Sequence, residues 1–316
     1  MKKILGLGVV FLLINILLFA STSPFVVLYG PFPNLRNTVV GAVGTSMHSH
    51  WLRYFMSDEE VNKVIADSMK TNGDLSNEII SQFNNNHSGE IKLTDVSSTR
   101  FQGYLMEISD PTRIKIGVAA TVGQKGQTVS EIARQNGAIA AVNAGGFMDA
   151  NGTGNGREPF GVVINNGCFV YGGNFTAPVP LIGFTKQGTL VTGKYTSKQI
   201  SAMQIIEGIS FYPTLIMNGK KQFTSGDGGW GIAPRTAIGQ KADGSILLLV
   251  IDGRQPQHSI GATIVDVQNI LYDNGAVTAA NLDGGSSTTM YFQGKVVNRP
   301  CDLLGERAIP TAILVI

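Results

Sequence analysis

The sequence predicts an α+β protein of mixed sheets with a central strand–helix–strand crossover, glycine-rich loops and an N-terminal transmembrane helix. Two apolar runs, Ile246–Ile251 and Ala276–Leu282, each end in Asp-Gly, as buried strands often do. Between them, apolar residues recur at helical spacing until the stop signal Asn274-Gly275. Such a unit normally joins two parallel strands, so both Asp-Gly ends are expected at one edge of a sheet. The 39 glycines fit loops that turn sharply or approach a ligand.

The composition supports a large core and argues against one class of partner. The chain has 316 residues, of which 43% are hydrophobic and 15% charged, which is enough for one large domain or two modest ones. The formal net charge is only +2 and no long basic run is present, so no nucleic-acid partner is expected.

The N-terminus carries a candidate membrane anchor. Lys2-Lys3 precede the uncharged apolar stretch Ile4–Ala20, and no charged residue follows until Arg36. The stretch is longer than most signal-peptide cores and its cleavage pattern is weak, so an uncleaved anchor is favoured over a cleaved signal. The charge bias predicts a single-pass protein of the cell membrane, with residues 1–32 as the anchor and the main domain extracellular.

Residues 33–89 are predicted to form a juxtamembrane helical segment and a linker. Ser57 and Glu60 make a capping box that opens a helix with one apolar face. His48 and His50 could suggest a metal site, but their aromatic neighbours favour an amphipathic stretch at the lipid interface. The polar residues 72–89 are typical of a linker, so the main domain is expected to cover residues 90–316.

The first half of this domain leads to a candidate sugar-binding residue, Asn143. Strands are expected over residues 91–96, 101–109 and 113–121. A helix capped by Thr128 then precedes a short strand that ends at Asn143. The Asn side chain offers both a donor and an acceptor, which suits a sugar hydroxyl or acetamido group. A simple turn asparagine is the alternative.

The glycine-rich loop that follows has two interpretations. Oxygen-bearing residues at alternate positions, Asp149, Asn151 and Thr153, match the rhythm of a calcium loop. The twelfth position, however, is Phe160 rather than the bidentate Glu. An active-site loop is therefore favoured and no cofactor is expected, with calcium as the alternative.

The rest of the domain is predicted to consist mainly of strands. Hairpin turns are expected at Asn166-Gly167 and Asn218-Gly219, and closing strands over residues 290–292, 295–297 and 308–316. Cys168 and Cys301 could form a disulfide in an extracellular domain, or Cys168 could be a buried free thiol.

Charged residues are expected to gather at one edge of the central sheet. The turn Lys241–Gly244 predicts a hairpin that brings Arg235 to the edge where Asp252 and Asp283 follow their strands. An Arg suits bidentate recognition of phosphate or carboxylate, and carboxylates suit acid–base or nucleophilic chemistry. The alternative is that each Asp-Gly only turns the chain.

Other side chains are weaker candidates. Trp230 could stack on a sugar ring or anchor its loop. His258 could act in acid–base chemistry, although its sequence neighbours do not fix it. Glu306 and Arg307 could pair with each other or contact a substrate. The sequence contains no Gly-x-Ser-x-Gly elbow, Walker loop or His-Glu-x-x-His motif, which argues against the enzyme classes that use them.

Several motifs resemble those of the phosphodiester glycosidase family. They are Asn143–Phe147 with Ala144 as an extra residue, Arg235–Gly239, Val250–Arg254, Asn281–Thr289 and Gly305–Pro310. The resemblance covers about residues 90–316. It implies hydrolysis of a glycosyl phosphodiester, and a cell-surface polysaccharide as substrate, since many bacterial relatives carry the label of exopolysaccharide biosynthesis protein.

The residues and the resemblance together suggest roles. Arg235 and Arg254 would hold the phosphate, and Asp283, or secondly Asp252, would act as base or nucleophile. Substrate contacts are expected from Asn143, Gly145, Gly146, Trp230, Gly284, Gly285, Ser286, Ser287, Glu306 and Arg307. Two other functions stay open: a non-catalytic membrane-anchored domain that binds glycan or wall polymer, and a metal-dependent phosphodiesterase that uses the 149–155 loop.

Overall fold

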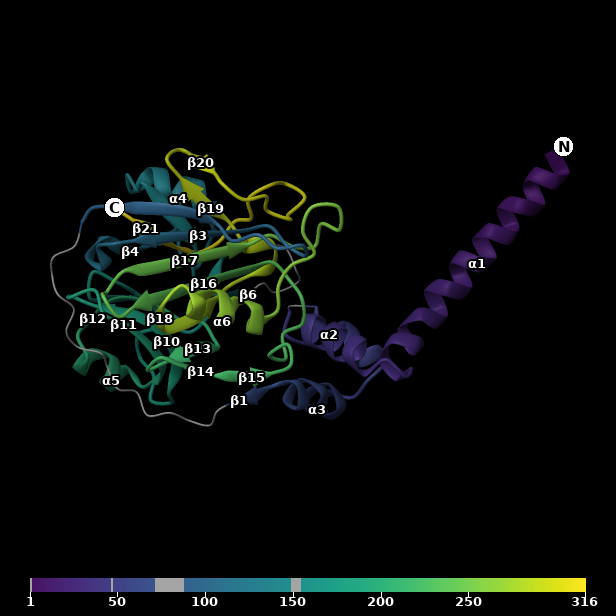
Figure 1. Ribbon diagram of the computed structural model, residues 1–316, viewed down its shortest axis with the longest axis horizontal. Coiled ribbons are helices and arrows are strands. Elements are labelled where there is room, and N and C mark those ends of the chain that lie inside the picture. The colour runs from purple at the N-terminus through teal and green to yellow at the C-terminus, as the bar shows by residue number, and fades with distance from the viewer. Residues whose placement is uncertain (1, 47, 72–87, 149–154) are drawn as a thin grey trace.

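The computed structural model describes residues 2–46, 48–71, 88–148 and 155–316. Figure 1 shows a long helix, α1 (Lys2–Tyr29), that extends away from a domain of sheets. The stretch Gly8–Tyr29 of this helix is long and apolar enough to cross a membrane. By these criteria alone it fits a membrane anchor or a signal sequence.

A small helical unit lies between α1 and the sheets (Figure 1). It consists of α2 (Pro33–Gly44), η1 (Ser49–Tyr54) and α3 (Asp58–Ser68), and we call these helices the N-terminal unit. They pack on one another through an apolar cluster that includes Val40, Leu52 and Val64. The predicted capping box of Ser57 and Glu60 opens α3. Most of the predicted linker lies outside the described residues.

The largest sheet has seven strands. In spatial order they are β14 (Lys220–Lys221), β13 (Thr214–Met217), β18 (Ala276–Leu282), β16 (Arg235–Lys241), β17 (Ile246–Ile251), β3 (Gly103–Ile108) and β2 (Ile91–Asp95). The four central strands are buried almost throughout, because both faces of the sheet are covered.

Two five-stranded sheets complete the core. One has the order β20 (Lys295–Val296), β19 (Met290–Phe292), β5 (Ala140–Asn143), β21 (Thr311–Val315) and β4 (Ile114–Val118). The other has the order β11 (Leu190–Tyr195), β10 (Val179–Thr185), β12 (Ile205–Ile209), β8 (Val163–Asn165) and β9 (Cys168–Tyr171). Two short pairs are β1 (Lys70–Thr71) with β15 (Phe223–Ser225), and β6 (Phe147–Met148) with β7 (Glu158–Pro159).

The sheets and helices form layers. One face of the seven-stranded sheet packs on both five-stranded sheets through apolar residues such as Met106, Leu248 and Ile313. Its other face is covered by α6 (Ile264–Asp273). The outer faces of the five-stranded sheets are covered by α4 (Val129–Gln135) and α5 (Ser197–Ala202), respectively. Two short 3-10 helices, η2 (Pro111–Arg113) and η4 (Gly285–Ser287), lie in connections.

The predicted α+β class and the crossover of β17, α6 and β18 are present, with one difference in pairing. The hairpin strand β16 lies between β17 and β18 and runs antiparallel to both, with Arg235 opposite Ile251 and Thr236 opposite Leu282. Every strand pair in the described residues is antiparallel. Even so, β17 and β18 run in the same direction. The start of β16 and the ends of β17 and β18 therefore meet at one edge, as the sequence predicts.

The two cysteines do not form a disulfide in this fold. Both thiols are free: Cys168 lies exposed on β9, and Cys301 is half-buried in the loop before β21.

Candidate active site

A cavity of about 470 Å³ opens at the edge of the seven-stranded sheet where β16 starts and where β17 and β18 end. Asp283 and the loop Gly284–Ser287 after β18 line it, together with Arg235 at the start of β16 and Arg254 after β17. Gly146 and Phe147, which follow β5 of the five-stranded sheet β20-β19-β5-β21-β4, also line it. The cavity therefore lies where two sheets meet, and most of the predicted site residues face it.

Asp283 is held on the cavity wall by its backbone. Its N–H donates to the carbonyl of Ala144 at 3.0 Å, and its carbonyl accepts from the Asn143 side-chain amide. Burial raises the pKa of the Asp283 carboxyl from its ordinary value of 3.8 to about 6. Hydrogen bonds from the Ser287 hydroxyl and the Gly284 N–H, and the charges of Arg307 and Arg254, oppose this rise in pKa. The carboxyl is therefore mostly ionised at pH 7 but poised to take up a proton near pH 6.

Three guanidinium groups line the same cavity, from Arg235, Arg254 and Arg307. Arg235 is buried, and its Nε and Nη2 donate to the carbonyls of Ala262, Trp230 and Gly231 at 3.0, 2.8 and 2.7 Å. Burial, and secondly the charge of Arg254, lower the pKa of Arg235 to about 9, so it stays cationic at neutral pH. Three cations around one cavity favour an anionic ligand such as a phosphodiester.

The position of Arg254 depends on the glycine loop after β18. Gly285 has φ +60°, and a Cβ placed on it would lie only 3.1 Å from Nη1 of Arg254. Arg254 itself has the unusual φ of +58°, and its N–H donates to the carbonyl of Ile260. A side chain at position 285 would therefore push the Arg254 guanidinium aside by a few tenths of an ångström.

Aromatic residues form another part of the wall. Tyr212 lies 5.4 Å from Trp230 and 5.6 Å from Phe211 between ring centroids, and Phe160 is 6.0 Å from Tyr212. All four line the cavity. Such a surface suits the apolar face of a sugar ring. Sequence reasoning missed Phe160, Phe211 and Tyr212, because aromatic residues beside strands usually belong to the core.

Asn143 lies behind the cavity rather than in its wall. It is fully buried, and its Oδ1 accepts from the Thr236 hydroxyl at 2.7 Å and the Thr289 N–H at 3.1 Å. With its Nδ2 bonded to the Asp283 carbonyl, this amide ties β5 to β16 and β18. The structure thus gives Asn143 a positioning role, where the sequence suggested contact with a sugar.

Two other predicted substrate contacts, Gly145 and Glu306, do not line the cavity. The N–H of Gly145 donates to the Thr311 hydroxyl at 3.2 Å, whereas its neighbour Gly146 does line the cavity. Glu306 accepts from the N–H of Ser130 at 2.9 Å and from the Ser130 hydroxyl. It therefore binds the first turn of α4, where the sequence suggested a pair with Arg307 or a substrate contact.

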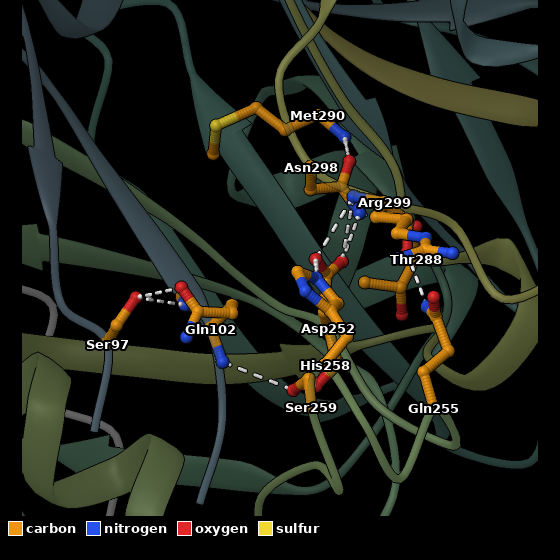
Figure 2. Close-up of polar contacts among 11 residues, drawn as sticks. Ser97, Gln102, Asp252, Gln255, His258, Ser259, Thr288, Met290, Asn298 and Arg299 are labelled. Carbon is orange, nitrogen blue, oxygen red and sulfur yellow. Dashed lines mark hydrogen bonds and ion pairs between the residues drawn. The ribbon is translucent and has the colours of Figure 1, made fainter. Parts of the chain in front are cut away.

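Asp252 lies at the predicted edge, but its carboxylate is used elsewhere (Figure 2). Oδ1 accepts from Nδ2 of Asn298 at 2.8 Å, and both oxygens lie 3.0–3.1 Å from the N–H of Arg299. Oδ2 also lies 2.9 Å from Nε2 of His258. The side chain is buried and does not line the cavity. This geometry makes Asp252 a clamp on the loop after β20 and gives His258 a partner that the sequence did not reveal.

The N-terminal unit also reaches the cavity, which the sequence did not indicate. Ala42, Thr45, Ser46 and His48 all line it. A juxtamembrane stretch with aromatic residues looks the same in sequence whether it rests on lipid or on protein, so no local signal marks this contact.

The calcium site that the sequence offers as an alternative stays a prediction. Asp149, Asn151 and Thr153 lie outside the described residues. Within the residues that the structure does describe, no group of three or more His, Cys, Asp or Glu side chains is arranged to hold a metal.

Known proteins are similar to this chain in sequence and fold. The family model for phosphodiester glycosidase matches residues 136–316. The bovine N-acetylglucosamine-1-phosphodiester alpha-N-acetylglucosaminidase is 29% identical over 59% of this chain and 37% of its own length. The YomE protein from a Bacillus subtilis prophage is 28% identical over 58% of this chain and 28% of its own. The chain thus spans well under half the length of these curated relatives.

A solved structure shows the same architecture. The catalytic domain of the zebrafish N-acetylglucosamine-1-phosphodiester alpha-N-acetylglucosaminidase, auto-inhibited by its pro-peptide, aligns with a TM-score of 0.58 at 23% identity. The alignment covers 78% of this chain and 86% of that one. The family match includes β5, the three cavity arginines and the Asp283 loop, and it extends over more than half of the chain. This chain therefore belongs to the phosphodiester glycosidase family, as its motifs predicted.

Proposed function

We propose that this protein hydrolyses a glycosyl phosphodiester at the bond between the sugar carbon and the phosphate oxygen. The observation that carries the proposal is the presence of one carboxylate, Asp283, and three guanidinium groups in a single cavity. The family and the names of its curated relatives support the same reaction class.

The cavity residues divide naturally between the two halves of such a substrate. Arg235, Arg254 and Arg307 bind the phosphate and stabilise its charge as it leaves. The aromatic wall around Tyr212 accepts the sugar ring. Asp283, mostly ionised at pH 7, acts as a base toward water or as a nucleophile at the sugar carbon. A phosphate leaving group needs little protonation, so one carboxylate suffices and Asp252 is not required in the cavity.

The substrate and its location are part of the proposal. The apolar helix α1 supports attachment to a membrane, with the domain on the outer side as the charge of Lys2-Lys3 favours. A cell-surface polysaccharide that contains sugar phosphodiesters fits this location. No cofactor enters the reaction as proposed.

The test measures release of free sugar by the full chain from a panel of sugar-1-phosphodiesters that includes N-acetylglucosamine. We expect release by the wild type, a fall of about 10³-fold or more in Asp283→Asn, and no effect of a chelator. The matched control is Asp252→Asn, which should keep turnover because that carboxylate does not face the cavity.

Other outcomes would select other functions. No release from any member, together with binding to wall polymers, would support a non-catalytic binding domain and overturn the hydrolase. Release that a chelator abolishes would support a metal-dependent phosphodiesterase instead.

A further inference from the structure

The N-terminal unit is built into the cavity. Thr45, Ser46 and His48 line the same space as Asp283 and Arg254. The His48 ring stacks on Trp51, with 4.8 Å between ring centroids, which orders this part of the wall. The cavity is therefore incomplete without a segment that precedes the family-matched residues 136–316.

A close backbone contact fixes this unit to the domain. A Cβ placed on Gly41 would lie 2.8 Å from the N of Gly231, and one placed on Gly231 would lie 2.2 Å from the carbonyl oxygen of Thr38. Neither position has room for a side chain, so α2 lies directly on the loop before β16. The carbonyl of Gly231 in turn accepts from Nη2 of Arg235 at 2.7 Å. The position of α2 is thus linked to a phosphate-binding arginine.

The same unit is joined firmly to the apolar helix. Leu28 is buried against it, the Tyr29 hydroxyl donates to the Phe55 carbonyl, and the Phe25 and Phe55 rings meet edge to face at 5.8 Å. Trp51 and Tyr54 are exposed beside these contacts, and such aromatic residues favour the membrane interface. The end of α1 therefore keeps a defined position relative to the cavity.

The distance from bilayer to cavity is short. Ala42 lies nine residues along α2 from its first residue, Pro33, which is about 14 Å at 1.5 Å per residue. If α1 spans the membrane, the apolar boundary lies near Tyr29, and the headgroup region beyond it is about 5–7 Å thick. The cavity wall at Ala42 is thus within about 14 Å of the start of α2, which follows Tyr29 by four residues, so the cavity lies close to the headgroup region on the outer side.

We infer that the substrate is a membrane lipid: a glycosyl phosphodiester whose second ester is a long-chain alcohol embedded in the same bilayer. This inference rests on the proposed hydrolysis, and it places the sugar phosphodiester on a lipid instead of in a polysaccharide chain. The N-terminal unit forms the wall on the lipid side of the phosphate. Water cleaves the bond between sugar carbon and phosphate oxygen, the sugar gains the hydroxyl, the remaining proton goes to solvent, and the lipid phosphate stays in the membrane.

The test uses the full chain reconstituted in phosphatidylcholine vesicles. Two substrates carry the sugar that is released fastest in the panel: one is esterified to a long-chain alcohol in the same vesicles, and the other is a water-soluble methyl ester. At equal total concentration we expect the lipid ester to be cleaved at least about tenfold faster, because enzyme and substrate share one surface. Cleavage of the methyl ester at an equal or greater rate would overturn the lipid substrate and leave the hydrolase standing. Cleavage of neither would overturn both.

A pair of variants tests the wall itself. Thr45→Tyr adds bulk inside the cavity, and Asn62→Tyr adds the same bulk on the exposed face of α3. We expect Thr45→Tyr to lower kcat/KM for the lipid ester by about tenfold, because an obstructed apolar contact costs about that much, and for the methyl ester by less than about threefold, because that ester lacks the obstructed lipid part. Asn62→Tyr should change neither value. An equal loss on both esters in Thr45→Tyr, or in Ser46→Tyr as a second variant, would show that this wall does not contact the lipid part.

Discussion

Two aspartates that follow equivalent strands should respond in opposite ways to the same substitution. The Asp252 carboxylate accepts from three groups, on Asn298, Arg299 and His258. Hydrogen bonds to a charged acceptor are worth about 1.5–3 kcal/mol and neutral ones about 1 kcal/mol, so Asp252→Asn should lower the free energy of unfolding by about 2–3 kcal/mol. For a domain of this size that corresponds to a fall in Tm of roughly 5–10 °C.

Asp283→Asn should do the reverse. The pKa of Asp283 rises from 3.8 to about 6 in the fold, which means that keeping this carboxyl ionised above pH 6 costs about 3 kcal/mol of stability. A neutral amide removes this cost, so the Tm at pH 7.5 should stay level or rise while turnover is lost.

Calorimetry and sugar release on the two variants, both well below their Tm, separate the cases. If Asp252→Asn had a normal Tm but lost turnover about 10³-fold, Asp252 would be a catalytic group. The geometry of the clamp would then be a poor guide to its role.

Four further predictions concern the same site. The folded Asp283 binds its proton more tightly than the unfolded chain does. The wild type should therefore have a lower free energy of unfolding than Asp283→Asn by the full amount above pH 6, and this difference should fade between pH 6 and 3.8. A difference that stays constant with pH in urea titrations would contradict the assignment. The same ionisation should give kcat/KM an acidic limb with an apparent pKa near 6, and a profile flat from pH 5 to 8 would exclude Asp283 as the base. Gly285→Ala should lower the free energy of unfolding by about 1–2 kcal/mol, because φ is +60°, and should raise KM by displacing Arg254. Gly294→Ala is the control: its φ is +88° with open space around it, so it should show only the backbone cost. Asn143→Ala should lower the free energy of unfolding by about 2–4 kcal/mol and should also lower turnover. The substitution leaves the buried Thr289 N–H without its side-chain acceptor and frees the Asp283 carbonyl. Normal stability in thermal melts would refute the positioning role of Asn143.

Much of the fold follows from local patterns. The apolar runs that end at Asp252 and Asp283, and the hairpin that carries Arg235, are short-range signals, and they place all three residues at one sheet edge. The family motifs have the same local character. They include most of the cavity residues after β18, together with Arg254 and Arg307.

What the sequence could not show are contacts over long separations. Asp252 turns to Asn298 and Arg299, 46 and 47 residues away, and nothing near Asp252 marks those partners. Glu306 bonds to Ser130, 176 residues away. Such distant partners decide in which direction the side chain of a turn residue points. The sequence therefore predicts where these carboxylates lie along the sheet but not where they point.

The contact between Gly41 and Gly231 also has a consequence for biosynthesis. At a ribosomal rate of about 5–20 residues per second, the loop that holds Gly231 is made roughly 10–40 s after α2. During that interval the loop on which α2 packs has not yet been made. The cavity can therefore close only late in synthesis, so a nascent chain passes through a stage in which α2 has been made but the cavity is incomplete.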